Sequence, residues 1–192
     1  MTDQIEIRSG ETTTPPEIDE TIREFCRGIS DNSPPVYVRV ERRRDAQLNE
    51  CFFNVQRAVE KKGGQLIYGW TIWLWPKVLV EAEHHAVWQK PTGELADVSP
   101  KADGEAKILF LTDPVATFDF QKRSSRDNIR KALVDDDDVR ALISFTKQIY
   151  DLVTDNKVGS KVTLTGPDIG LFKSLQSIRS DLVRRIKIRV AS

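Results

Sequence analysis

The sequence predicts an α+β protein in which a cysteine-bearing helix packs on an antiparallel β-sheet, with further helices at the C-terminal end. Apolar residues recur at helical spacing near both ends of the chain, and β-branched and aromatic runs fill the middle. The segments therefore follow one another as helix, meander of strands, then helices, which is typical of α+β proteins. A chain of 192 residues is long enough for one domain with a sizeable core.

The N-terminal segment predicts an arm and then a helix. Residues 1–16 are polar and end in two prolines, so we expect a flexible arm there. Thr14 and Glu17 resemble a capping box with Pro15 at the first helical position. The helix that follows has an apolar stripe of Ile18, Ile22, Phe25 and Ile29. A loop over 31–35 then leads to a short strand over 37–41.

A second helix is predicted over residues 50–62. Phe52, Val55 and Val59 lie on one of its faces, and Gly63-Gly64 follows it as a stop signal. Asn49 is the predicted N-cap. Cys51 then falls at about the second helical position.

Strands are predicted next, beginning with 65–75, whose residues are β-branched or aromatic on both faces, as in a central strand covered on both sides. A hairpin follows, with strands over 78–88 and 94–98 around the turn KPTG. Residues 107–111 form another predicted strand.

The remaining residues are predicted to be mostly helical, with helices over 127–133, over 138–154 and from Pro167 onward. We expect a single domain overall. Residues 17–122 form its α+β core, and residues 123–192 form a helical part packed on that core.

Charge and composition exclude several classes of function. Lysine plus arginine equals aspartate plus glutamate, at 29 each, so no overall field points to nucleic acid or to an anionic membrane. The longest apolar run is too short to span a bilayer, and no secretory signal is visible at the N-terminus. With only two cysteines, we expect reduced thiols in the cytoplasm.

Cys51 is the candidate nucleophile. A thiolate is stabilised at a helix N-terminus by unpaired N–H groups and the positive end of the dipole, and the same N–H groups can stabilise an oxyanion. A base is also needed, and the chain has two histidines, His84 and His85, both on the strand over 78–88. Asp97, on the next strand, is the candidate group that orients the base.

The choice between the histidines depends on the turn. If a three-residue loop centres on Thr92, then Val87 faces Asp97, and His85 and Asp97 are diagonal neighbours on one face. A two- or four-residue loop would favour His84 instead. Strand register alone leaves both histidines open.

Two motifs resemble known thiol enzymes. The order of Cys at a helix start, His on a strand and Asp on the following strand resembles the papain-like and transglutaminase-like superfamily, and HAVWQKPTGELADVSP (85–100) is similar to the transglutaminase-core hairpin. This resemblance implies a papain-like/transglutaminase-like core in which His85 is the base and Asp97 its orienting carboxylate. CFFNV (51–55) is similar to the start of N-terminal glutamine amidohydrolases, which implies that Asn54 contacts or holds substrate.

The chain is therefore predicted to be a cysteine hydrolase or acyltransferase acting on an amide bond of a protein or peptide, as an amidase, deamidase or peptidase, without a cofactor. Trp70 and Trp88 are candidate substrate contacts in an aromatic groove. The basic loop ERRRD (41–45) is either a solvated loop or a site for an acidic substrate.

Two other functions stay open. One is an interaction module on the same fold without catalysis, and the other is a metal-binding protein that uses cysteine, histidine and glutamate ligands. No CxxC or HxxxH spacing accompanies those ligand types. The sequence does not indicate an oligomeric state.

Overall fold

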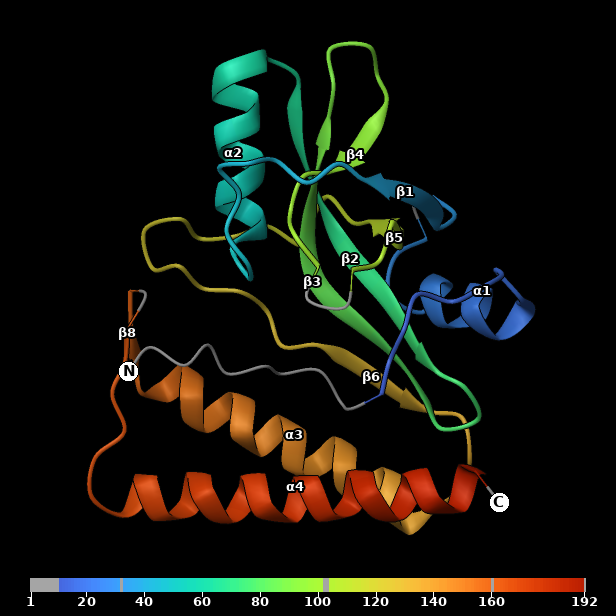
Figure 1. Ribbon diagram of the computed structural model, residues 1–192, viewed down its shortest axis with the longest axis vertical. Coiled ribbons are helices and arrows are strands. Elements are labelled where there is room, and N and C mark those ends of the chain that lie inside the picture. Colours follow the sequence, from blue (N-terminus) through green and yellow to red (C-terminus); the bar gives the residue numbers. More distant parts are fainter. Residues whose placement is uncertain (1–10, 32, 102–103, 160, 192) are drawn as a thin grey trace. The chain divides into compact units, whose positions relative to one another are not determined.

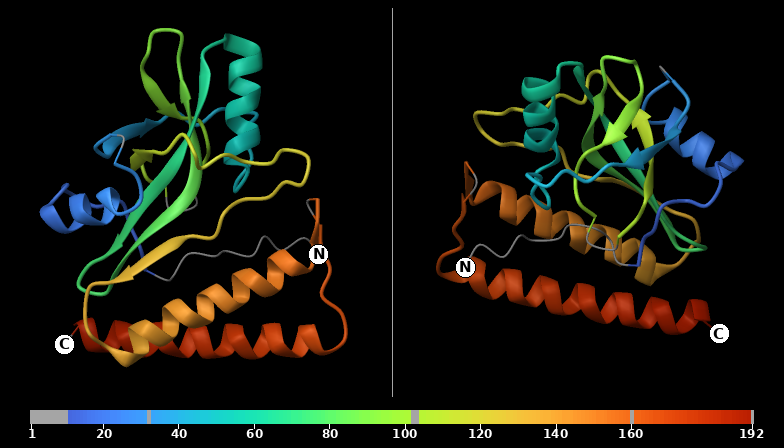
Figure 2. Two further views of the ribbon diagram at one scale, coloured as in Figure 1. Left: turned by 180° about the vertical axis from the view of Figure 1, so that it is seen from behind. Right: turned by 45° about the horizontal axis from the view of Figure 1, so that its top comes forward.

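The computed structural model describes residues 11–31, 33–101, 104–159 and 161–191 and shows a mixed α+β protein (Figures 1 and 2). Four helices and eight strands are found within these residues. In chain order they are α1 (Glu20–Arg27), β1 (Val36–Val40), α2 (Cys51–Lys62), β2 (Gln65–Trp75), β3 (Leu79–Gln89), β4 (Leu95–Asp97), β5 (Lys107–Thr112), β6 (Ile129–Ala132), α3 (Asp137–Asp155), β7 (Lys157–Val158), β8 (Lys161–Val162) and α4 (Pro167–Ala191).

The chain divides into two compact units. The first, called here the barrel unit, comprises Thr14–Trp73 and Ala82–Phe118. The second, the helical unit, comprises Leu74–Glu81, Asp119–Ser192 and the residues up to Thr13. The strands β2 and β3 contribute residues to both units. The division falls near the boundary predicted at residue 122, but the tip of the β2–β3 hairpin groups with the helical unit. That the C-terminal part packs on the core as a single domain stays a prediction.

Five strands of the barrel unit follow the order β2-β5-β1-β4-β3, and β3 also pairs with β2, so the order returns to its start. This topology differs from the predicted meander, because β5 lies between β1 and β2 and because β1 pairs in parallel with β4. The buried residues of its core include Val38, Trp73, Val87, Ile108 and Phe110.

The helix α2 is confirmed where the sequence predicted it, and its amphipathic pattern explains its position. Phe52, Val55 and Ala58 are buried on one face, while Lys61 and Lys62 lie in the last turn, where positive charge suits the helix dipole. Gly63 follows with a φ of 72°, and the N–H group of this residue bonds to the Val59 carbonyl, which ends the helix.

The helix α1 begins later than predicted. Its N-cap is Asp19, whose side chain accepts a hydrogen bond from the N–H group of Ile22, so the Thr14–Glu17 capping box does not form. Thr13 instead exchanges two backbone hydrogen bonds with Leu74. Residues 1–10 of the predicted flexible arm lie outside the described residues.

The helical unit contains one corrected prediction and two confirmed helices. The predicted helix over 127–133 is wrong: Ile129–Ala132 forms strand β6, which pairs with β3. Burial of Glu81 explains the difference, because Arg130 on the strand pairs with Glu81 at 2.9 Å and so compensates its charge. The helices α3 and α4 pack together around buried residues that include Leu142, Leu182 and Ile186. Among the described helices, none is both long and apolar enough to cross a membrane.

Candidate functional site

Cys51 is the first residue of α2 and is half-buried in the barrel unit. The preceding N-cap residue, Glu50, makes no side-chain capping bond, and the first turn contains no acidic residue. Asn49, the predicted N-cap, instead adopts a left-handed backbone conformation with a φ of 58°. The thiol therefore lies at a helix N-terminus where no acidic side chain of the first turn competes with a thiolate for the dipole.

The β3–β4 hairpin brings His85 and Asp97 together. The N–H group of Lys90 donates to the Glu94 carbonyl at 2.8 Å, and the pairing of Trp88 with Ala96 sets the register. His85 and Asp97 consequently lie on one face, as in the three-residue loop considered above. Nε2 of His85 lies 3.1 Å from Oδ2 of Asp97, within hydrogen-bond distance. The two residues are only 3% and 0% exposed, so water screens this pair little.

His84 is on the opposite face of β3. Its ring packs between Phe52 and Trp70, with ring centroids 4.7 Å and 5.3 Å away. Its Nε2 lies 2.7 Å from the carbonyl oxygen of Ala116. His84 therefore belongs to the packing between α2 and the strands, and the histidine paired with Asp97 is His85.

Lys101 is a fourth member of the site, which sequence reasoning missed. Its Nζ lies 2.6 Å from Oδ2 of Asp97, and its side chain is only 9% exposed. A lysine four residues after an aspartate in a Pro-containing loop carries no sequence signal for such burial. Asp97 thus lies between two cationic groups, His85 and Lys101.

Burial and these charges set the proton affinities. Burial and the charge of Lys101 lower the pKa of His85. The opposite effect of Cys51 and Asp97 is larger, so the pKa of His85 is raised to about 9. Burial alone would raise the pKa of Asp97, whereas His85 and Lys101 hold it well below its usual range. Burial lowers the pKa of Lys101, but Asp97, Glu83 and Cys51 outweigh this effect and raise it. At neutral pH the arrangement favours a carboxylate flanked by two cations.

Cys51 is linked to this group by its electrostatic effect on His85 and Lys101, while the Nε2 atom of the His85 ring is directed to Asp97. With Asp97 ionised and both His85 and Lys101 protonated, the three residues carry one net positive charge. A thiolate at Cys51 would cancel that charge. The site can therefore hold a thiolate and an imidazolium together.

Asn54 ties the start of α2 to the segment that directly follows Asp97. Its Oδ1 accepts from the N–H group of Gln47 at 2.9 Å, and its Nδ2 donates to the Gln47 carbonyl at 2.7 Å and to Ser99 Oγ at 3.1 Å. The N–H group of Ser99 in turn donates to Oδ1 of Asp97 at 2.9 Å. These bonds give Asn54 a positioning role, and its predicted contact with substrate stays a prediction.

The two candidate substrate tryptophans are largely buried. Trp70 is 3% exposed and donates from Nε1 to Asp113, and Trp88 is 6% exposed and donates from Nε1 to the Gly63 carbonyl. An exposed aromatic groove is therefore not formed by these two rings, and their contact with substrate stays a prediction. Trp88 does line a pocket with basic residues, described below.

Comparison with known proteins assigns no family or fold relative to this chain. The chain matches no protein-family model, no curated protein and no solved structure in the three comparisons made. In the described part of the chain, no three histidine, cysteine, aspartate or glutamate residues are grouped as a metal site would require. The geometry and charges of Cys51, His85, Asp97 and Lys101 are therefore the features that indicate a function.

Proposed function

We propose that this chain is a cysteine hydrolase or acyltransferase that attacks an amide bond of a protein or peptide through Cys51. The observation that carries the proposal is the buried pair of His85 and Asp97, with Nε2 and Oδ2 separated by 3.1 Å, within the electrostatic reach of a thiol at a helix N-terminus. A nucleophile, a base and a group that orients the base are the parts that thiol catalysis needs.

In the proposed reaction, Cys51 Sγ attacks the carbonyl carbon as a thiolate, and backbone N–H groups at the start of α2 stabilise the oxyanion. Imidazolium His85 then gives its Nδ1 proton to the leaving nitrogen, and the C–N bond breaks to form a thioester. His85 takes a proton from water, or from an acceptor amine, which attacks the thioester and restores the thiolate. Thiol–base contacts often tighten only when substrate is bound.

Lys101 has a positioning and charge-balancing role in this proposal. Without its ammonium group, Asp97 and His85 would form a neutral pair and a thiolate would add an uncompensated charge. With Lys101 protonated, these four groups together are neutral when Cys51 is a thiolate, and the half-buried Glu83, which accepts from Trp73 Nε1, adds a carboxylate near Lys101 that also favours its protonated form. Since burying an unpaired charge is costly, Lys101 favours the reactive form of the thiol.

The same residues support, by analogy, a papain-like or transglutaminase-like core. Cys51 begins a helix, His85 is on β3 and Asp97 is on β4, which is the order expected of that superfamily. Action on a side-chain amide of a protein or peptide is our preferred reaction, and this preference depends on analogy with related thiol chemistry.

Turnover of a peptide library tests the proposal. The full chain is incubated with amidated and glutamine-containing peptides, and products are identified by mass spectrometry. Cleaved, deamidated or cross-linked peptides are expected with the wild-type chain and with Cys26→Ser, which alters only a buried thiol that burial holds protonated.

The matched variant is Cys51→Ser, which keeps nearly the same side-chain volume but replaces the thiol. Loss of turnover in this variant alone supports the proposal. Turnover that persists in Cys51→Ser, or none from the wild-type chain across the library, would contradict it.

A further inference from the structure

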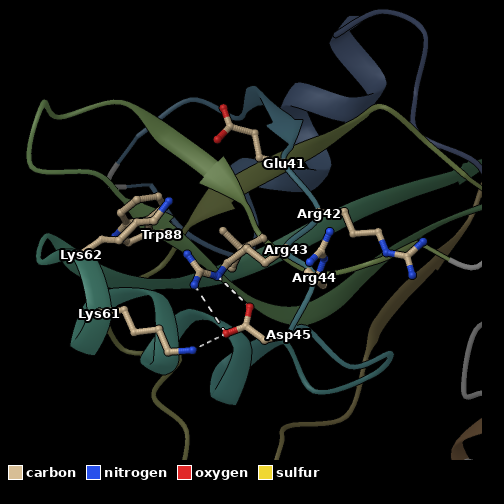
Figure 3. Close-up of a pocket in the computed structure, with 9 residues that line it drawn as sticks. Glu41, Arg42, Arg43, Arg44, Asp45, Lys61, Lys62 and Trp88 are labelled. Atoms are coloured by element: carbon tan, nitrogen blue, oxygen red, sulfur yellow. Dashed lines mark hydrogen bonds and ion pairs between the residues drawn. The ribbon is translucent and has the colours of Figure 1, made fainter.

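A basic pocket lies in the barrel unit, at the other end of α2 from Cys51. It has a volume of about 600 Å³ and is open to solvent. Its lining comes from the loop after β1, the last turn of α2, β3 and the residue after β4, namely Glu41, Arg42, Arg43, Arg44, Asp45, Lys61, Lys62, Trp88 and Val98 (Figure 3). The basic loop singled out in the sequence is therefore one wall of a pocket rather than an isolated solvated loop.

Positive charge is concentrated in this pocket. Five of its lining side chains are cationic and two are carboxylates, although the whole chain carries equal numbers of acidic and basic residues. Both carboxylates are already paired within the protein. Glu41 accepts from Lys90 Nζ at 2.8 Å, and Asp45 is held by Arg43 at 3.1 Å and by Lys61 at 2.7 Å. The local field consequently favours an anionic ligand.

The pocket is also pre-organised. Asp45 joins the loop to α2 because its carboxylate pairs with Arg43 on the loop and with Lys61 on the helix (Figure 3). Backbone bonds fix the same loop to the strand that carries the candidate active site, since the N–H group of Glu41 donates to the Asp97 carbonyl at 2.7 Å. The exposed Arg42 and Arg44 are on the same short loop. An anion that binds here would meet a loop whose backbone is already held by Asp45 and β4, which lowers the entropic cost of binding, while the exposed side chains of Arg42 and Arg44 supply the charge.

We propose that this pocket binds a peptide segment that carries several acidic side chains. The inference deepens the proposed function and rests on it: the acidic segment belongs to the substrate whose amide Cys51 attacks. A peptide with neighbouring carboxylates can form ion pairs with cations on both walls of the pocket, with Arg42 and Arg44 on one side and Lys62 on the other.

Spacing along α2 relates the pocket to the thiol. Lys61 lies ten positions after Cys51 on α2, so at 1.5 Å per residue the two are about 15 Å apart along the helix axis. An extended peptide covers that distance in roughly four or five residues. We therefore expect the acidic residues of the substrate about four or five positions from the residue whose amide is attacked.

The pocket is less suited to nucleic acid. Proteins that bind single strands add exposed aromatic rings on which bases stack. Trp88, the aromatic residue of the lining, is 6% exposed, and Lys62 lies over its ring at 5.7 Å from the centroid. A peptide with carboxylates needs no such stacking surface.

Fluorescence anisotropy with a labelled oligoglutamate peptide tests the inference. The full chain carrying Cys51→Ala is titrated, so that no turnover occurs during the measurement. Binding is expected at low salt and should weaken at high salt, because exposed charges are screened. Replacement of two exposed cations, Arg42→Gln with Arg44→Gln, should weaken binding about fivefold.

The matched control removes the same charge elsewhere, with Lys173→Gln and Arg184→Gln on exposed positions of α4. It should bind the peptide as Cys51→Ala alone does. Three results would overturn the inference: no binding of oligoglutamate, an equal loss in the two double variants, or tighter binding of a labelled single-stranded DNA.

A kinetic comparison separates this inference from the proposed chemistry. If a peptide substrate is found, Arg42→Gln with Arg44→Gln should raise KM for acidic peptides and leave kcat unchanged. Peptide binding without any turnover by the wild-type chain would contradict the proposed function and leave the pocket as a binding site. Turnover with no preference for acidic peptides would overturn the pocket inference alone.

Discussion

Replacement of His85 by glutamine should remove a pH dependence from the stability of the protein. Glutamine cannot gain a proton, but its side-chain amide can still donate to Asp97 in the place of Nε2. The comparison therefore changes one titrating group and keeps its hydrogen bond. Wild type and His85→Gln are compared at a series of pH values.

The expected loss of stability follows from the raised pKa of the His85 imidazole. The pKa of His85 is raised from 6.5 to about 9. A group whose pKa is raised on folding stabilises the folded state fully below its unfolded pKa, and this contribution is lost as the pH rises through the folded value. Between pH 6.5 and 9 the wild-type protein should thus lose up to about 3 kcal/mol from this residue.

Urea unfolding followed by tryptophan fluorescence measures the effect. The difference in unfolding free energy between wild type and His85→Gln should shrink steadily from about pH 6.5 to about pH 9. Cys26, whose pKa burial raises to about 12, also changes stability at alkaline pH, but it does so in both proteins and cancels in the difference. A difference that stays constant across this range would refute the assignment of a protonated, buried His85.

Three further variants probe the surroundings of the site. Lys101→Met should slow alkylation of Cys51 by iodoacetamide at neutral pH about tenfold or more, whereas Lys101→Arg should restore part of the rate. Equal rates in the wild type and both variants would contradict the role of Lys101 in charge balance. Asn54→Ala should lower the unfolding free energy by about 1–3 kcal/mol in urea titrations, because Gln47 loses both of its partners; an unchanged midpoint would contradict its positioning role. Arg130→Met should cost about 3–5 kcal/mol in the same assay and Arg130→Lys less, and equal losses would argue against the Glu81 ion pair.

Local patterns predicted the elements that carry their own signals. The helix α2 has an apolar face, a glycine stop and lysines in its last turn, and the sequence predicted it to within a residue. The strands β2 and β3 are long and rich in β-branched and aromatic residues, so they too were predicted. In these segments, propensity and tertiary packing favour the same structure.

Elements that depend on distant partners were not predicted. Residues 127–133 have helical spacing, yet Ile129–Ala132 forms β6 because pairing with β3 and the burial of Glu81 outweigh local propensity. The parallel pairing of β1 with β4 likewise joins segments more than fifty residues apart, which no local pattern encodes.

The candidate site was predicted only in part, because some of its contacts also depend on residues that are brought together by the fold. The sequence supplied Cys51, His85 and Asp97, but the choice of histidine depended on the β3–β4 turn. A one-residue change of register would have placed His84, instead of His85, on the same face as Asp97. Lys101 could not be found, since its position depends on how the loop after β4 folds back onto Asp97.

The rate of Cys51 alkylation as a function of pH tests the central claim most directly. Comparison with Cys26 alone is insufficient, because that thiol is buried and would react slowly in any case. The informative control is His85→Gln, which keeps Cys51 and replaces only the buried base. If the His85 imidazolium favours the reactive thiol, iodoacetamide should alkylate Cys51 faster in the wild-type chain than in the variant below about pH 9, and the two rates should converge as His85 loses its proton above it. Identical pH profiles for the two proteins would contradict the account.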